Sequence, residues 1–140
     1  MWRTTVHLTF LVNCETSLEK YKHDLDNSSG KNFREDFYCL CQEDNSLELK
    51  KAFIKQNLRK KITNEIIAYG LMGAARHNQL NNALIILELV KKYKEISLDD
   101  INSVKALYQS GHIENIKNIF STDEIKLIME NEINEKKIIS

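Results

Sequence analysis

A local pattern that recurs about every 33 residues, a period typical of helical-repeat arrays, constrains the fold of this chain more than any other feature. Leu47, Leu80 and Ile113 recur at one constant interval, and the agreement is firmest between the segments 78–83 and 111–116. In such an array each unit is a helix, a tight turn and a second helix. The pattern therefore predicts a mostly α protein, either a short α-solenoid or a helical bundle of stacked helix-turn-helix hairpins.

The residues on either side of each turn support this interpretation. Asn45, Asn78 and Gly111 precede the recurring aliphatic residues, and Asn and Gly adopt a positive φ at the lowest cost. After the turn, a large aliphatic residue is expected to anchor the second helix against the first, with apolar residues at helical spacing behind it. The residues assigned to this structural repeat are Leu47, Leu80, Ala83, Gly111, His112 and Ile113.

The segments 74–80 (AARHNQL) and 110–117 (SGHIENIK) resemble the helix-turn-helix core of ankyrin repeats, a family with the same period. The resemblance covers roughly residues 36–120. It implies stacked hairpins that recognise other proteins, and it implies that the ring of His112 bonds neighbouring backbone and ties one repeat to the next. The chain departs from the family in lacking its Thr-Pro-Leu-His opening and all proline. Tetratricopeptide or pentatricopeptide arrays and an unrelated helical bundle remain alternatives.

The chain is expected to form a single domain over residues 1–140. Residues 1–31 form a divergent N-terminal segment and loop, in which alternating apolar residues from Val6 to Val12 suit a short strand or one turn of helix. About three helical hairpins follow over 32–120, and a capping helix with a polar tail completes the chain over 121–140.

Two helix starts in the second half carry chemical markers. Ser97 is followed three residues later by Asp100, and Ser121 by Glu124. In each pair the hydroxyl can accept from an otherwise unpaired helix amide, and the acid lies near the positive end of the helix. Helices are therefore expected to begin at these positions.

The charge balance excludes a strong global field. Twenty basic residues balance twenty acidic ones, so any electrostatic partner must recognise a local patch. No run is long and apolar enough for a membrane span, and the N-terminal stretch lacks the features of a secretory signal. The chain is expected to be cytoplasmic, and its Lys-, Asn- and Ile-rich composition without proline is similar to that of effectors of intracellular bacteria or accessory proteins of large DNA viruses.

The most prominent local patch is the run 50–61, which holds six basic residues and no acid. Lys51, Lys55 and Arg59 recur every four residues and should line one helix face, which suits an acidic protein partner or, as an alternative, nucleic acid phosphates. A solvated surface helix would show the same pattern. The candidate partner-binding residues are Lys51, Lys55, Arg59, Tyr69, Arg76 and Tyr108.

Motifs for catalysis are missing from the chain. It has no phosphate-binding loop, no dinucleotide glycine fingerprint, no His-Glu-x-x-His and no nucleophile elbow. A thiolate activated by imidazole is a second alternative, with Cys14, Cys39 or Cys41 beside one of the four histidines, and a zinc site at Cys39 and Cys41 is a weaker one. Core packing explains these cysteines better, and three cysteines favour a reducing compartment over a disulfide framework.

These observations predict a non-catalytic protein that binds another protein by occupancy, as an inhibitor, adaptor or scaffold. No cofactor or metal is expected, and nucleic acid is the less favoured partner.

Overall fold

The computed structural model describes the backbone of residues 24–139 and the side chains of residues 24–130. This part of the chain is helical and contains no strand. The strand expected between Val6 and Val12 lies outside the described residues. After a short helical segment at residues 24–27 come α2 (Gly30–Gln42), α3 (Ser46–Leu58), α4 (Asn64–Arg76), α5 (Leu80–Tyr93), α6 (Leu98–Gln109), α7 (Ile113–Ile119) and α8 (Thr122–Ile139).

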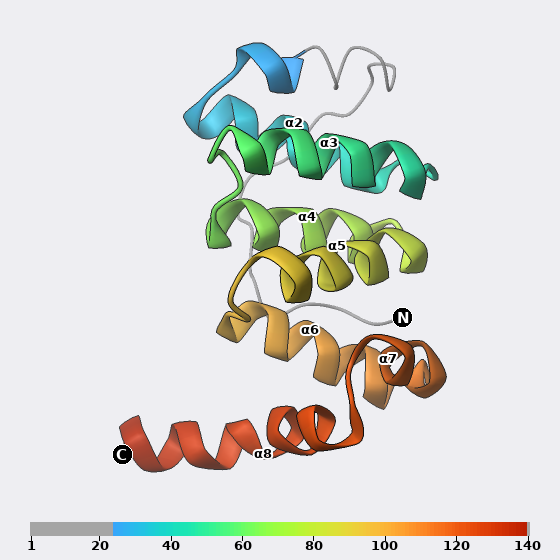
Figure 1. Ribbon diagram of the computed structural model, residues 1–140, viewed down its shortest axis with the longest axis vertical. Coiled ribbons are helices and arrows are strands. Elements are labelled where there is room, and N and C mark those ends of the chain that lie inside the picture. Colours follow the sequence, from blue (N-terminus) through green and yellow to red (C-terminus); the bar gives the residue numbers. More distant parts are fainter. Residues whose placement is uncertain (1–23, 140) are drawn as a thin grey trace.

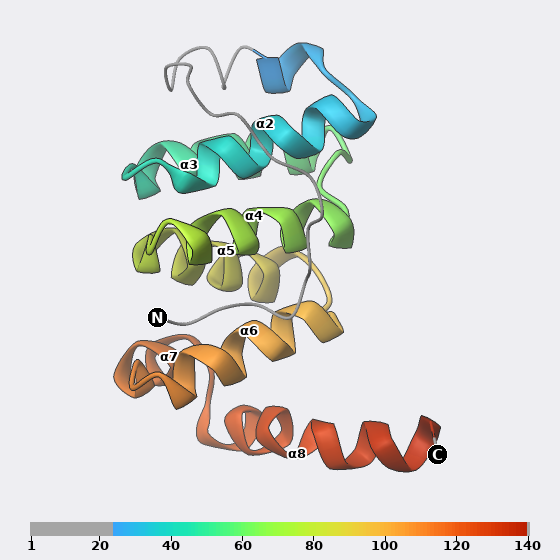
Figure 2. The same ribbon diagram turned by 180° about the vertical axis from the view of Figure 1, so that it is seen from behind.

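The helices pair into hairpins that stack along the long axis of the molecule (Figure 1). The pairs within the described residues are α2 with α3, α4 with α5, and α6 with α7, and α8 packs below α6. Contacts between α2, α4 and α6 make one layer, and contacts between α3, α5 and α7 make the other. Figure 2, seen from behind, brings the α2–α4 layer to the front. The mostly α stack of hairpins expected from the sequence is thus the observed fold.

The turns inside the hairpins follow the sequence prediction in two cases of three. Asn78 has φ 55° and Gly111 has φ 97°, as a left-handed turn residue requires. Asn45 has φ −154°, so the prediction was wrong for the first hairpin. Asn45 instead caps α3, because its side-chain oxygen accepts from the amide of Glu48 at 3.3 Å.

Both helix starts marked by serine are confirmed. Ser97 and Asp100 form a reciprocal capping box at the start of α6. At α8, the amide of Glu124 donates to Ser121 Oγ at 3.2 Å, and the amide of Ser121 donates to Glu124 Oε1 at 2.9 Å. These short-range bonds fix where each helix begins, independently of the partner it packs against.

The recurring aliphatic positions do not all reach the core. Ala83 is fully buried, and Leu80 and Ile113 are half-buried as the first residues of α5 and α7. Leu47 is 61% exposed, which corrects the expectation that it anchors α3. The first residue of α3 is Ser46, so the first hairpin is offset by one residue from the register of the recurring pattern. One residue rotates a helix position by about 100°, which turns Leu47 to solvent.

A buried amide joins the first hairpin to the second. Asn82 of α5 is 1% exposed, and its Nδ2 donates to the carbonyl oxygens of Cys41 at 2.7 Å and Glu43 at 2.6 Å. Its Oδ1 accepts from the hydroxyl of Ser46 at 2.9 Å. The side chain therefore satisfies carbonyls at the end of α2 that have no partner within their own helix. It thereby binds the turn between α2 and α3 to α5 of the next hairpin.

The α2–α4 contact depends on two glycines. A Cβ added at Gly73 would lie 2.6 Å from the carbonyl oxygen of Tyr38, and one at Gly70 would lie 2.5 Å from Cε2 of Phe37. The two helices therefore approach more closely than any larger side chain at these positions would allow.

Candidate interaction surface

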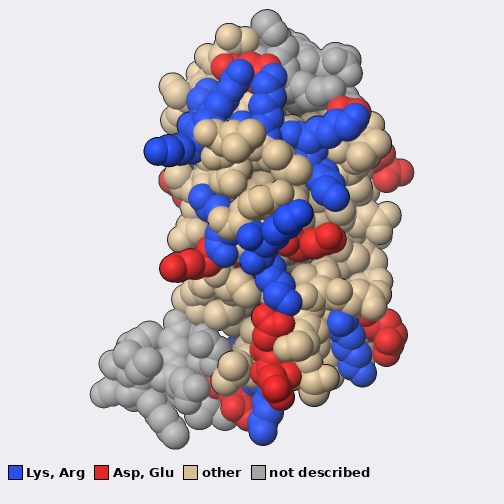
Figure 3. All heavy atoms as spheres, in the orientation of Figure 1, with Lys and Arg blue, Asp and Glu red and all other residues tan. Residues whose placement is uncertain are grey.

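The basic run predicted at residues 50–61 lies on α3 and the loop after it. We call the layer formed by α3, α5 and α7 the outer layer. Lys50, Lys51 and Lys55 are on α3, and the rest of the run forms its C-cap and the loop to α4. Figure 3 looks onto the outer layer, and Lys and Arg side chains gather over its upper half, with uncharged surface between them. The charge balance of the whole chain thus conceals a local excess of positive charge.

Part of this excess is neutralised within the protein by Asp26 of the helical segment 24–27. Its carboxylate accepts from Lys55 Nζ at 2.8 Å, Gln56 Nε2 at 2.7 Å and Arg59 Nη1 at 3.2 Å. The hydrogen bond from Lys55 is the largest of the effects that lower the pKa of Asp26. Of the three cations predicted to line one helix face, Lys55 and Arg59 are therefore already bound within the chain.

The role of Asp26 was missed by the sequence analysis. Residues 26–31 have a loop-like composition, and the partners of Asp26 lie far along the chain, on α3 and its C-cap. Lys61 reinforces the same contact, because its Nζ donates to the carbonyl of Ser28 at 3.0 Å. Leu25, beside Asp26, is fully buried. No local signal in the sequence marks this contact.

The remaining cations of the run are more available. Lys51 pairs with Glu48 at 3.7 Å, with its side chain 64% exposed, and exposed pairs of this kind contribute little stability. Lys50 and Lys60 are exposed and make no ion pair with a described residue.

The solvent side of α3 also carries apolar residues. Leu47 and Leu58 are 61% and 80% exposed, and Ile54 between them is half-buried. At about 100° per residue these three positions fall within about 40° of one another around the helix axis. The fully buried Leu49 and Phe53 lie on the opposite side. We call Leu47, Ile54 and Leu58, with Lys50, Lys51 and Lys55 beside them, the α3 outer face.

The neighbouring outer helix does not repeat this chemistry. The exposed residues of α5 before its last two positions are Asn81, Glu88 and Lys91, and its leucines and isoleucines are buried or half-buried. An amphipathic helix normally turns polar residues to water. The α3 outer face departs from that rule, which makes it the strongest candidate for an interaction surface within the described residues.

The other three candidate partner-binding residues lie on the opposite layer. Tyr69 of α4 is half-buried beneath the guanidinium of Arg34, which is 5.0 Å from the ring centroid and paired with Glu65. Tyr108 of α6 is half-buried, and Arg76 is exposed at the end of α4. The structure therefore does not bring the six candidates into one site: Lys51, Lys55 and Arg59 belong to the outer layer.

The two described cysteines, Cys39 and Cys41, show no reactive arrangement. Cys39 is disulfide-bonded, so the expectation of wholly reduced cysteines does not describe this residue. Cys41 is a free, fully buried thiol whose pKa is raised well above its ordinary value by burial, which disfavours the nucleophilic thiolate. Cys39 and Cys41 are two residues apart on α2, a spacing that turns their side chains to different sides of the helix. Cys14, His7 and His23 lie outside the described residues.

The two described histidines, His77 and His112, lie at helix ends. His112 is the N-cap residue of α7, and its side chain makes no capping hydrogen bond. The ring of His77 packs edge-on against Tyr38, with centroids 6.4 Å apart. Within the part of the chain that the structure describes, no group of three His, Cys, Asp or Glu side chains could hold a metal ion. None of the described helices is long and apolar enough to cross a membrane.

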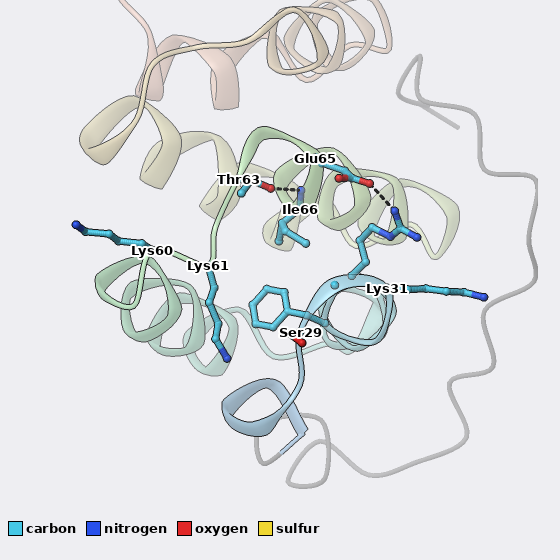
Figure 4. A pocket seen from close by; sticks show the side chains of 10 residues that line it. Ser29, Lys31, Lys60, Lys61, Thr63, Glu65 and Ile66 are labelled. Carbon is cyan, nitrogen blue, oxygen red and sulfur yellow. Dashed lines mark hydrogen bonds and ion pairs between the residues drawn. The ribbon is translucent and has the colours of Figure 1, made fainter.

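A hollow of about 320 Å³ lies where α2 begins, beside the α3–α4 loop and the start of α4 (Figure 4). Four cations line it, but Figure 4 shows Lys31 and Lys60 pointing away from it. Lys61 donates to backbone carbonyls, and Arg34 is paired with Glu65. The hollow therefore lacks the free inward cations that an anion site requires.

Searches against protein families, curated proteins and solved structures find no match to this chain. The resemblance to ankyrin repeats therefore stays a prediction.

Proposed function

We propose that this protein is a non-catalytic recognition module that binds another protein through the α3 outer face. The observation that carries the proposal is the exposure of Leu47 and Leu58 on the side of α3 opposite its core residues. Covering large apolar side chains that are exposed to water lowers the free energy, so their burial by a partner favours binding. By this proposal the protein acts by occupancy, as an inhibitor, adaptor or scaffold.

The rigid support behind the face suits this role. Leu49 and Phe53 anchor α3 from below, and the bonds of Asp26 hold its C-terminal half. A surface fixed in this way loses little conformational entropy when a partner binds.

Nucleic acid is the alternative, because the run 50–61 supplies the cations that phosphate binding needs. Two features weigh against it. Lys55 and Arg59 are already bound by Asp26 within the chain. Exposed leucines also add nothing to a contact with a phosphate backbone.

The test is capture of partners from lysate with the tagged full chain, with and without nuclease, read by quantitative mass spectrometry. The proposal expects a protein that is retained after nuclease and is lost with the double variant Leu47→Ser/Leu58→Ser. Leu127→Ser is the matched control, since Leu127 is 66% exposed on α8, away from α3. Enrichment that disappears on nuclease treatment would instead support nucleic acid binding.

A further inference from the structure

We infer that the occupant of the α3 outer face is an acidic, amphipathic helical segment of a partner protein. This inference rests on the proposed function and adds the chemistry of the partner. It is carried by the arrangement of leucines and lysines on α3 and by the way Asp26 already binds the same helix.

The apolar stripe formed by Leu47, Ile54 and Leu58 has the length of a short helix. Leu47 and Leu58 are eleven residues apart, a distance of about 16 Å or three helical turns. A partner helix lying along α3 could place its own apolar residues against this stripe over the same three turns. Such helix-on-helix recognition uses anchors at intervals of three and four residues.

The charges flank the stripe on both sides. By helical geometry, Lys50 projects on one side of the leucines, and Lys51 and Lys55 project on the other. Glu48 is the single acidic residue of α3. A partner helix with an apolar centre and acidic flanks is therefore complementary to the face, and a basic or neutral helix is not.

Asp26 shows that a carboxylate can bind the basic residues of α3 and its C-cap. It is bound by one lysine, one arginine and one glutamine of the same helix region, all between 2.7 and 3.2 Å. These three partners lie toward the edge of α3 that faces residues 24–27, whereas Lys50 and Lys51 remain exposed on the outer side. Lys50, which makes no ion pair with a described residue, and Lys51, whose pair with Glu48 is long and exposed, can therefore offer a partner's carboxylate the same chemistry next to exposed leucines.

A second copy of this chain is the main competing occupant. On α8, Asp123, Leu127 and Glu130 are exposed and fall at intervals of four and three residues, so they too present acids around a leucine. A contact between α8 of one copy and α3 of another would give a dimer or ring where the geometry closes and an open polymer where it does not. The exposed Lys126 lies next to Leu127, so α8 matches a basic face less well than a segment whose leucines have only acidic neighbours. We therefore favour a foreign segment, and the experiment distinguishes the two.

The experiment selects peptides of about 15 residues, enough to span the stripe, from a random display library on the full chain. Recovered sequences should carry aliphatic residues three or four apart, flanked by Asp or Glu. Binding of a synthetic recovered peptide, measured by fluorescence anisotropy, should weaken by about tenfold to a hundredfold in Leu47→Ser/Leu58→Ser and in Lys50→Glu/Lys51→Glu. Lys117→Glu/Lys126→Glu is the matched control, because it changes the net charge equally on α7 and α8.

Three results would overturn the inference. Recovered peptides without acidic enrichment would contradict the charge argument, and binding unchanged in both α3 variants would place the site elsewhere. Concentration-dependent dimers or larger assemblies in sedimentation velocity, abolished by Leu127→Ser, would identify a second copy as the occupant. The proposed function survives each of these results if lysate capture still yields a nuclease-resistant protein that is lost with Leu47→Ser/Leu58→Ser, so the two failures are distinguishable.

Discussion

The side chain of Asn82 should be the most costly polar group to remove from the stack, and Asn82→Ala tests this directly. The truncation deletes two hydrogen bonds to carbonyl oxygens of the first hairpin and one from Ser46. Each bond contributes about 1 kcal/mol net, and a buried carbonyl left without a partner adds to the loss. We expect the free energy of unfolding to fall by about 2–4 kcal/mol.

Urea and thermal unfolding followed by circular dichroism measure the effect. For a chain of this length, about 1 kcal/mol corresponds to about 4 °C in Tm, so a decrease of about 8–16 °C is expected. Asn81→Ala is the matched control, because Asn81 is the exposed neighbour on the same helix and the change in helix propensity is the same. Asn82→Asp keeps the size but points an acceptor at two carbonyls, and it should become more destabilising as pH rises and the carboxyl ionises. If Asn82→Ala and Asn81→Ala differ by less than about 0.5 kcal/mol, the proposed link between hairpins is refuted.

Two further predictions address the helix contacts. Gly73→Ala should lower stability, because the added Cβ meets the carbonyl oxygen of Tyr38 and overpacking costs about 1–3 kcal/mol, more than the helix-propensity gain of about 1 kcal/mol; a rise in the urea midpoint would contradict the close α2–α4 approach. Asp26→Asn should flatten the acid limb of the stability profile. The folded-state pKa of Asp26 is lowered, so its stabilisation is present above the unfolded pKa and is lost as pH falls through the folded pKa. Burial raises the pKa of Asp100 and gives the opposite slope, so the informative quantity in pH-dependent melting is the difference between wild type and variant; identical acid limbs would show that the Asp26 contact is not formed in solution.

Short-range chemistry made the fold class predictable. The recurring hairpin pattern, positive-φ turn residues at Asn78 and Gly111, and capping serines at 97 and 121 are all read from short segments, and each appears in the structure where the sequence places it. The first hairpin carries the weakest version of the pattern, and the register there was wrong by one residue. The N-cap positions Ser29, Thr63 and Ser97 are also evenly spaced, one residue wider than the recurring aliphatic positions. This second spacing marks the starts of α2, α4 and α6 and would have corrected the register.

The candidate surface was only partly predictable. The basic run is visible in the sequence because its residues are consecutive, and the interval of four placed Lys51, Lys55 and Arg59 on one helix. The apolar half of the α3 outer face could not be recognised, because periodicity alone does not say whether an aliphatic residue faces the core or water. Leu47 was assigned to the core for that reason.

The helices, two of the three hairpin turns and the density of positive charge near residues 50–61 can therefore be derived from the sequence, because these depend on neighbours within a few positions along the chain. Which cations remain available depends on helix packing, since Asp26 is distant from Lys55 and Arg59 in sequence but 2.8 and 3.2 Å away in space. Packing also brings Asn82 onto the α2–α3 turn and leaves Leu47 and Leu58 facing solvent. Burial and ion pairing are properties of how helices pack, and packing brings together residues that no local pattern connects.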